Sequence, residues 1–386
     1  MLRLGYILLA LLLALLPCSS EAQGYVVVQT STARYAAYTG PQGDTVRHGF
    51  YTQRFGHGAI EQEGYYRHGQ PDSLWITYYP SGARRSAVRY RSGLRHGAFI
   101  FWNTDGSIHQ EGRFANDSLQ GPLLTYHSNG QVDTRSMYRG GRLEGRSEVY
   151  TADGRLRLRA DYRCDTLHGL WESYYDTGEL NYRGQMHRGR YADTLLSFYK
   201  SGALMRWALY ADGVLHGPLQ SFYESGAVHV RSVYERGMLH GEFVELHENG
   251  QVLERGRYAH GQRVGEWCSY YPSGQLHAQG CYADGRYSGM WRVYHPSGCP
   301  KQLGGYRDGM AHGLWSHYDV QGHLLNRGWY LRNEPQGCWT TFYPNGRIAG
   351  YQYFVDGMVV GPRRLFYDDG RVAPIGGSSA QKEAAP

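Results

Sequence analysis

A single interval organises this chain: glycine recurs every 24 residues, without insertion or deletion, from Gly58 to Gly370. Fixed periods of 20–50 residues are typical of arrays in which one small unit is stacked many times. The interval predicts about 14 copies over residues 45–373. The glycines are Gly58, Gly82, Gly106, Gly130, Gly154, Gly178, Gly202, Gly226, Gly250, Gly274, Gly298, Gly322, Gly346 and Gly370.

Four further columns keep the same period. Counted from the repeated glycine, position −4 is aromatic in twelve of fourteen copies and position +2 is aliphatic in twelve. In the thirteen full copies, position +6 is Gly, Ala or Ser eleven times, and position +8 is Tyr or Phe twelve times. Side-chain size and polarity therefore repeat along with the glycine.

Each copy contains two candidate chain reversals. Pro-Ser-Gly at 272–274 suits a type I turn closed by a left-handed glycine. The second turn usually reads Gly-x-x-x-Gly, as from Gly213 to Gly217. Where its first glycine is missing, residue types that tolerate positive φ take its place, namely Asp117, Asp165 and Asn333.

The segments between turns are about 6–8 residues long and rich in Tyr, Val and Trp, which indicates β-strands. We therefore predict an all-β fold, an elongated antiparallel meander of about 14 tandem 24-residue β-hairpin repeats. Such a meander of roughly 28 strands would extend about 130 Å if flat. Residues 23–44 are expected to form a lead-in or cap, and residues 374–386 a disordered tail.

Strand alternation predicts which columns share a face. If Tyr270 opposes Leu276, positions −4, +2, +6 and +8 lie together and form the core. A tryptophan column at −7 then has the opposite parity and is a candidate binding stripe. The alternative is burial, on a second packed face or through a bulge, and we favour it. The candidate stripe comprises Trp171, Trp267, Trp291, Trp315 and Trp339.

A basic column stands at position +9 in the first half of the array. Neighbouring copies lie about one Debye length apart, so their potentials would overlap and attract anions. The alternative, which we favour, is a row of solvated strand ends. The candidate anion-binding stripe comprises Arg67, Arg91, Arg139 and Arg163.

Catalytic signatures are missing from the sequence, including His-Glu-x-x-His, Gly-x-Ser-x-Gly, a phosphate loop and Cys-x-x-Cys. Histidines recur before the second turn, but the only two in adjacent copies, His216 and His240, would lie about 10 Å apart, too far to share a metal. Carboxylates such as Glu172 lie near turns and are expected to be solvated. We predict no enzyme activity, no cofactor and no metal.

The N-terminus indicates export. Arg3 precedes an apolar run, and Ser20-Glu21-Ala22 fits a cleavage site, which predicts a signal peptide over residues 1–22 that is cleaved after Ala22. Lipid attachment at Cys18 is the alternative, disfavoured by the preceding Pro17. The expected location is the periplasm, the outer membrane or the extracellular space.

The pattern Gly-x-Trp-x-x-Tyr-Tyr-x-x-Gly-x-Leu occurs at Gly169 to Leu180 and at Gly265 to Leu276. It resembles the MORN repeat, in the variant form found in bacterial secreted and antitoxin-type proteins, and the resemblance covers about residues 45–373. The standard MORN unit is one residue shorter. The resemblance implies stacked hairpins and a role in scaffolding, phospholipid association or toxin neutralisation.

The leading hypothesis is an exported, non-enzymatic scaffold that binds a macromolecular partner at the cell envelope. The resemblance adds two alternatives: an antitoxin or immunity-type protein, and a peripheral membrane protein that uses the basic column. A protein or envelope surface is the expected partner, an anionic membrane is the alternative, and no nucleic acid is expected. The sequence does not indicate an oligomeric state.

Overall fold

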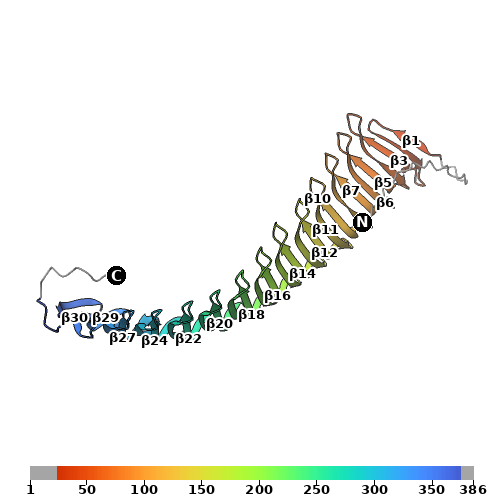
Figure 1. Cartoon of the computed structure of the whole chain (residues 1–386). Helices are drawn as coiled ribbons and strands as arrows, with labels where there is room; N and C mark the ends of the chain where they lie inside the picture. Colours follow the sequence, from red (N-terminus) through yellow and green to blue (C-terminus); the bar gives the residue numbers. More distant parts are fainter. Residues whose placement is uncertain (1–23, 375–386) are drawn as a thin grey trace. The chain divides into compact units, whose positions relative to one another are not determined.

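The computed structural model describes residues 24–374, and all their regular elements are β-strands (Figure 1). The chain divides into two units, residues 1–142 and 143–386. The predicted signal peptide, its cleavage site, Cys18 and nearly all of the predicted tail lie outside the described residues. Residues 24–374 include no helical segment with the length and apolar character that a membrane crossing requires.

The strands of the first unit begin in the lead-in, which contributes β1 and β2, and continue into the repeats. They are β1 (Val26–Gln29), β2 (Ala33–Thr39), β3 (Thr45–Arg54), β4 (Ile60–Arg67), β5 (Gln70–Tyr78), β6 (Arg84–Arg91), β7 (Leu94–Trp102), β8 (Ile108–Ala115), β9 (Ser118–Leu119), β10 (Gly121–Tyr126) and β11 (Val132–Arg139).

The second unit continues the same succession of hairpins. Its strands are β12 (Arg142–Tyr150), β13 (Leu156–Arg163), β14 (Thr166–Tyr174), β15 (Leu180–His187), β16 (Arg190–Phe198), β17 (Leu204–Ala211), β18 (Val214–Phe222), β19 (Val228–Glu235), β20 (Met238–Leu246), β21 (Val252–Ala259), β22 (Gln262–Tyr270), β23 (Leu276–Ala283), β24 (Arg286–Tyr294), β25 (Pro300–Arg307), β26 (Met310–Ala311), β27 (Gly313–Tyr318), β28 (Leu324–Leu331), β29 (Glu334–Phe342), β30 (Ile348–Val355) and β31 (Met358–Leu365).

Consecutive strands pair antiparallel, and the 31 strands belong to one open sheet. In two places a strand is split in two, because β8 pairs with both β9 and β10 and β25 pairs with both β26 and β27. The last repeated glycine, Gly370, lies in the turn between Phe366 and Val372, which form a single bridge. The predicted all-β antiparallel meander of hairpin repeats is confirmed.

Both predicted turns form along the array, and every repeated glycine from Gly58 to Gly370 has positive φ. At the first turn, Gly274 has φ 84° and its amide donates to the Tyr271 carbonyl at 2.8 Å. At the second turn, the residues that replace glycine do adopt positive φ: 65° at Asp117, 64° at Asp165 and 69° at Asn333. Their short polar side chains tolerate the left-handed conformation, as the sequence predicted.

The predicted distribution of columns between the two faces is wrong for positions −4 and +2. Tyr270 does oppose Leu276, but a bulge follows at once, and Trp267 opposes Gly280. Because Trp267 and Tyr270 are three residues apart, their side chains point to opposite faces. An extra residue in one strand reverses the alternation beyond it. Position +6 therefore shares a face with the tryptophan column, not with the aromatic column at −4.

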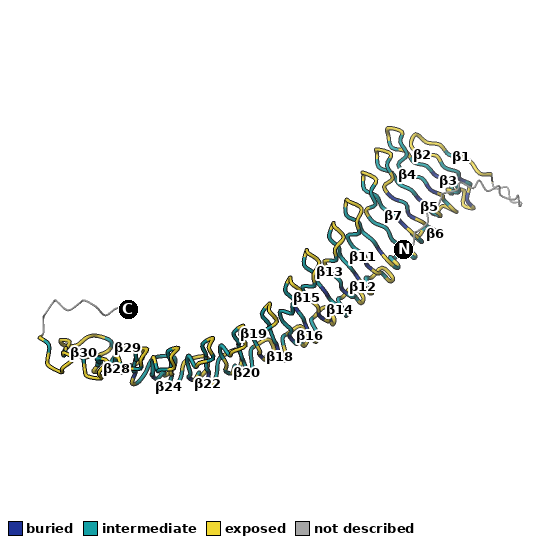
Figure 2. The backbone as a smooth tube through the Cα atoms, in the orientation of Figure 1, coloured by how far each residue is buried: buried dark blue, intermediate teal, exposed yellow. Residues whose placement is uncertain are grey.

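We call the side that carries positions −7, +6 and +8 the tryptophan face, and the other side, which carries −4, −6 and +5, the reverse face. In the first unit the tryptophan face holds a buried cluster of Val88, Phe99, Phe114 and Leu123. In the second unit Ala160, Ala208, Trp267 and Trp315 are buried there. Burial follows the strands, and the hairpin turns are exposed (Figure 2).

Neighbouring repeats of the second unit are also joined near their first turns. The Tyr175 hydroxyl donates to the Phe198 carbonyl at 2.8 Å, and Tyr199 makes the same bond to Phe222 at 2.8 Å. Tyr223 donates to the Leu246 carbonyl and Tyr271 to the Tyr294 carbonyl in the same way. This bond explains why tyrosine occurs at position −3, because the ring packs while the hydroxyl donates to a carbonyl of the next hairpin.

Candidate functional site

The tryptophan column of the second unit is part of a packed ladder. Tyr282 lies between Trp267 and Trp291, with ring centroids 6.0 and 5.3 Å away. Tyr306 and Tyr330 continue the pattern from Trp291 to Trp315 and on to Trp339, all in edge-on contacts. Edge-to-face contacts at these distances are favourable for aromatic rings. The +8 tyrosines therefore fill the gaps between successive tryptophans.

The small residues at +6 make room for the indoles. A Cβ added to Gly304 would overlap the Trp315 ring, and Gly280 has the same relation to Trp291. The indole nitrogen of Trp315 donates to the Gly305 carbonyl at 3.1 Å, so its polar atom is satisfied as well. Four members of the column are thus held by a glycine beneath the ring and a backbone acceptor beside it, namely Trp267, Trp291, Trp315 and Trp339.

The predicted tryptophan stripe is consequently not an open surface. Trp267 and Trp315 are only 3% and 4% exposed, and Trp171, Trp291 and Trp339 are half-buried. Packing of the ladder matches the alternative in which a bulge places the rings on the core face. A binding role for this column remains a prediction, with little accessible indole surface to support it.

The predicted arginine stripe lies at strand ends. Arg67, Arg91 and Arg139 end β4, β6 and β11 of the first unit and are exposed, and Arg163 ends β13 of the second unit in the same way. Within residues 24–374 no carboxylate forms an ion pair with any of the four. Their positions suit both solvated ends and anion binding, so the anion-binding role remains a prediction.

The reverse face of β12–β15 carries an ionic network that the sequence did not reveal. Glu172 is 2% exposed. Its carboxylate accepts hydrogen bonds from Arg183 at 2.7 Å, Arg159 at 3.2 Å and the Tyr174 hydroxyl at 2.7 Å. Arg159 also pairs with Glu148 at 3.2 Å. The expectation that Glu172 is solvated is wrong, because position −6 faces arginines across both neighbouring strands.

The network shifts the ionisation of its members. Burial alone would raise the pKa of Glu172, but bonds from Tyr174 and Arg183 and the charges of Arg183 and Arg159 together lower it. Burial and the bond to Glu172 raise the pKa of Tyr174 to about 12. At neutral pH Glu172 is therefore ionised and Tyr174 is protonated. Such a fully partnered cluster is suited to a structural role.

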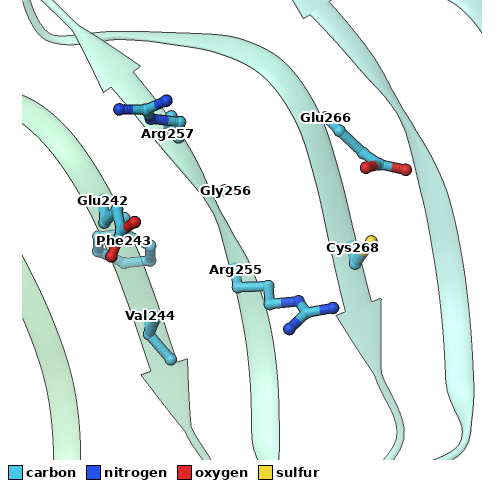
Figure 3. Close-up of a pocket in the computed structure, with 8 residues that line it drawn as sticks. All are labelled: Glu242, Phe243, Val244, Arg255, Gly256, Arg257, Glu266 and Cys268. Carbon is cyan, nitrogen blue, oxygen red and sulfur yellow. The ribbon is translucent and has the colours of Figure 1, made fainter.

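A hollow of about 330 Å³ opens on the sheet over β20–β22 (Figure 3). Glu242 opposes Arg257 and Val244 opposes Arg255 across one pair of strands, and Arg255 opposes Cys268 across the next. The Arg255 side chain is directed toward the strand that carries Cys268. With two arginines and two glutamates in its lining, the hollow is polar and electrically balanced.

A different surface appears on the reverse face of the last repeats. Trp329 and Leu314 oppose each other and are 56% and 46% exposed. Met290 and Tyr353, which occupy equivalent positions in the neighbouring copies, are about half exposed too. Trp329 was missed from the sequence because position +7 varies from copy to copy. A search for variation within otherwise regular columns would have found it.

The described part of the chain, residues 24–374, contains five free cysteines. No group of three or more His, Cys, Asp or Glu side chains comes together there to hold a metal ion. Two histidines do meet at some second turns, as His240 and His260 do with ring centroids 5.3 Å apart. Cys268 and Cys281 are both unpaired, because Cys281 faces Glu266 across its hairpin.

The fold and these surfaces define a protein built from β-hairpin repeats. The family model described as the MORN repeat variant matches residues 167–187, 239–260, 263–284 and 335–356. All four stretches lie in the second unit and coincide with hairpins β14–β15, β20–β21, β22–β23 and β29–β30. The chain therefore contains MORN repeats of the variant type, and the resemblance seen in the sequence is confirmed.

Similar solved structures are larger assemblies. Those titled "Crystal Structure of TcdB2-TccC3-Cdc42" and "Crystal Structure of TcdB2-TccC3" are 11% identical to this chain, with a TM-score of 0.16. The matches cover 87% of this chain and 23% and 24% of those chains, so the chain spans about a quarter of their length. The likeness carries neither fold nor function over to this chain. No curated protein matches it.

Proposed function

We propose that this protein is a non-enzymatic repeat scaffold that binds another macromolecule at the bacterial cell envelope after export. The observation that carries the proposal is the exposed apolar surface around Trp329 on the reverse face. Clustered apolar side chains of this size are uncommon on a surface that meets only water, and they often belong to binding sites. Export rests on the pattern of residues 1–22.

The repetitive architecture also favours binding over catalysis. An active site requires an unlike group of side chains at one place. Here each hairpin repeats the same backbone, and side-chain differences are spread along the sheet. A long series of equivalent positions suits recognition of an extended partner.

Affinity capture from envelope extracts tests this function. Mature chain beginning at Gln23 is immobilised, captured components are identified by mass spectrometry, and each is then purified and titrated against the chain. Direct, saturable binding of one component supports the proposal. Absence of any such component, or turnover of an envelope glycan by the pure chain, contradicts it. Loss of export when residues 1–22 are deleted tests the location separately.

A peripheral membrane role is the second candidate, favoured by the exposed, unpaired Arg67, Arg91, Arg139 and Arg163. It predicts binding to anionic vesicles that weakens with salt. Replacing all four arginines by serine should then reduce vesicle binding at least tenfold. Unchanged binding by that variant would exclude the arginine stripe. Toxin neutralisation remains a prediction of the family resemblance alone.

A further inference from the structure

The exposed apolar side chains of the last repeats lie in one column, in which Gly305 occupies the position on β25 between Met290 and Leu314. Leu314 opposes Trp329 on β27 and β28, and Cys338 opposes Tyr353 on β29 and β30. Met290 on β24 occupies the same position as Leu314, one period earlier. Adjacent strands lie about 4.8 Å apart, so the column from Met290 to Tyr353 crosses five spacings and is about 24 Å long.

Its exposure does not result from a loosely packed sheet. Directly beside Leu314 and Trp329, Trp315 opposes Gly328, and both are buried on the tryptophan face. Trp329 also belongs to a strand paired on both sides, well away from the sheet edge at β31. The backbone is therefore fixed, and the large side chains project from it into solvent.

Arginines without carboxylate partners flank this column. Arg292 lies two residues after Met290, and Arg327 lies two residues before Trp329. Arg364 lies two residues after the exposed Pro362. Side chains two residues apart in a strand share a face, so all three arginines lie on the reverse face. Opposite them stand Leu303, Ser316 and Tyr351. All three arginines are exposed, and within the described residues none lies within 4.0 Å of a carboxylate.

Carboxylates in this region are confined to the ends of strands. Asp308 and Asp356 occupy second turns, and Asp319 and Asp368 occupy first turns, where arginines are present as well. Positive charge is consequently concentrated along the middle of the strands. A flat anionic bilayer would press its headgroups against the turn carboxylates too. A narrow segment lying along the column would meet apolar, uncharged polar and arginine side chains, and no carboxylate.

We propose that this column docks an acidic, amphipathic segment of a partner protein. The inference rests on the proposed binding function and specifies its site and the chemistry of its partner. Apolar side chains of the segment would cover Leu314 and Trp329, and its carboxylates would pair with Arg327 and Arg364. Tryptophan and arginine are the residues most often found to dominate binding energy at such interfaces. A helix of about 16 residues has the length of the column.

The test uses two labelled 16-residue helical peptides that carry leucines on one face. One has glutamates on the other face and the second has lysines instead. Fluorescence anisotropy measures their binding to the mature chain, to Trp329→Ser and to Arg327→Ser/Arg364→Ser. Leu325→Ser is the matched control, because Leu325 is 43% exposed on the same strand but lies outside the column.

The glutamate peptide is expected to bind at least tenfold more tightly than the lysine peptide. Both column variants should weaken its binding at least tenfold, and Leu325→Ser less than twofold. Equal binding of the two peptides, or equal binding by Trp329→Ser and the wild type, overturns the proposal.

Two further outcomes would replace it. Vesicles of phosphatidylglycerol and phosphatidylcholine that bind in a Trp329-dependent manner, without peptide binding, would assign the column to a membrane. A dimer in sedimentation equilibrium that Trp329→Ser abolishes would assign it to a second copy. If envelope capture is intact in Trp329→Ser, the proposed function survives and only this site fails.

Discussion

The reverse face is built in two contrasting ways along the second unit. Over β12–β15 its central column pairs Glu148 and Glu172 with Arg159 and Arg183. Over β24–β31 equivalent positions hold arginines with no carboxylate, beside exposed Leu314 and Trp329. The backbone is the same hairpin in both regions. One region therefore satisfies its charges internally, and the other leaves charge and apolar surface available for a partner.

The largest expected difference in stability is between substitutions on the two faces of the last repeats. Trp315→Ala removes a buried indole from the ladder and should destabilise the chain by about 3–5 kcal/mol. Trp329→Ser, on the adjacent strand, should change stability by only about 0.5 kcal/mol. Urea unfolding monitored by circular dichroism compares the two. Similar midpoints for both variants would show that the assignment of the faces is wrong.

A substitution in the ionic network around Glu172 should have an intermediate effect on the free energy of unfolding. Glu172→Gln removes the negative charge and one of the two acceptor oxygens that serve two arginines and Tyr174, and should cost about 1–3 kcal/mol at pH 7. The pKa of Glu172 is lowered in the folded state, so its contribution exists above the unfolded pKa of about 4.3 and disappears as pH falls through the folded value. Urea midpoints of the wild type and variant should therefore converge in acid.

A constant difference between those midpoints from pH 7 down to pH 2 would contradict the ionic account of Glu172. Arg292→Gln provides the matched comparison in the last repeats, because Arg292 is exposed and has no ion-pair partner there. Its stability should differ from the wild type by about 0.5 kcal/mol or less across the same pH range.

The sequence predicted the repeat, both turns and the hairpins because each depends on residues close together in the chain. Gly274 fixes one turn and Asp165 can substitute for glycine at the other, whatever the distant packing. The distribution of faces could not be predicted. Each repeat hairpin from β3–β4 to β29–β30 contains a bulge, as at Ser269 and Tyr270, and one extra residue reverses the face of the side chains beyond it.

The candidate sites were missed for a related reason. A repeated residue such as Trp315 draws attention, but repetition here reflects the packing that every hairpin needs. Trp329 occurs once in a variable column, and the burial of Glu172 depends on arginines contributed by two other strands. In such an array, constancy identifies the core, and function is better sought where one copy departs from its neighbours.

Hydroxyl-radical footprinting of a chain that comprises residues 23–386, read by mass spectrometry, tests the central claim most directly. It compares oxidation of Trp329 and Trp315 with and without the partner captured from the envelope. We predict rapid oxidation of free Trp329, slow oxidation of Trp315, and at least fivefold protection of Trp329 when the partner is bound. Equal oxidation of the two tryptophans, or an unprotected Trp329 in the complex, would contradict the account.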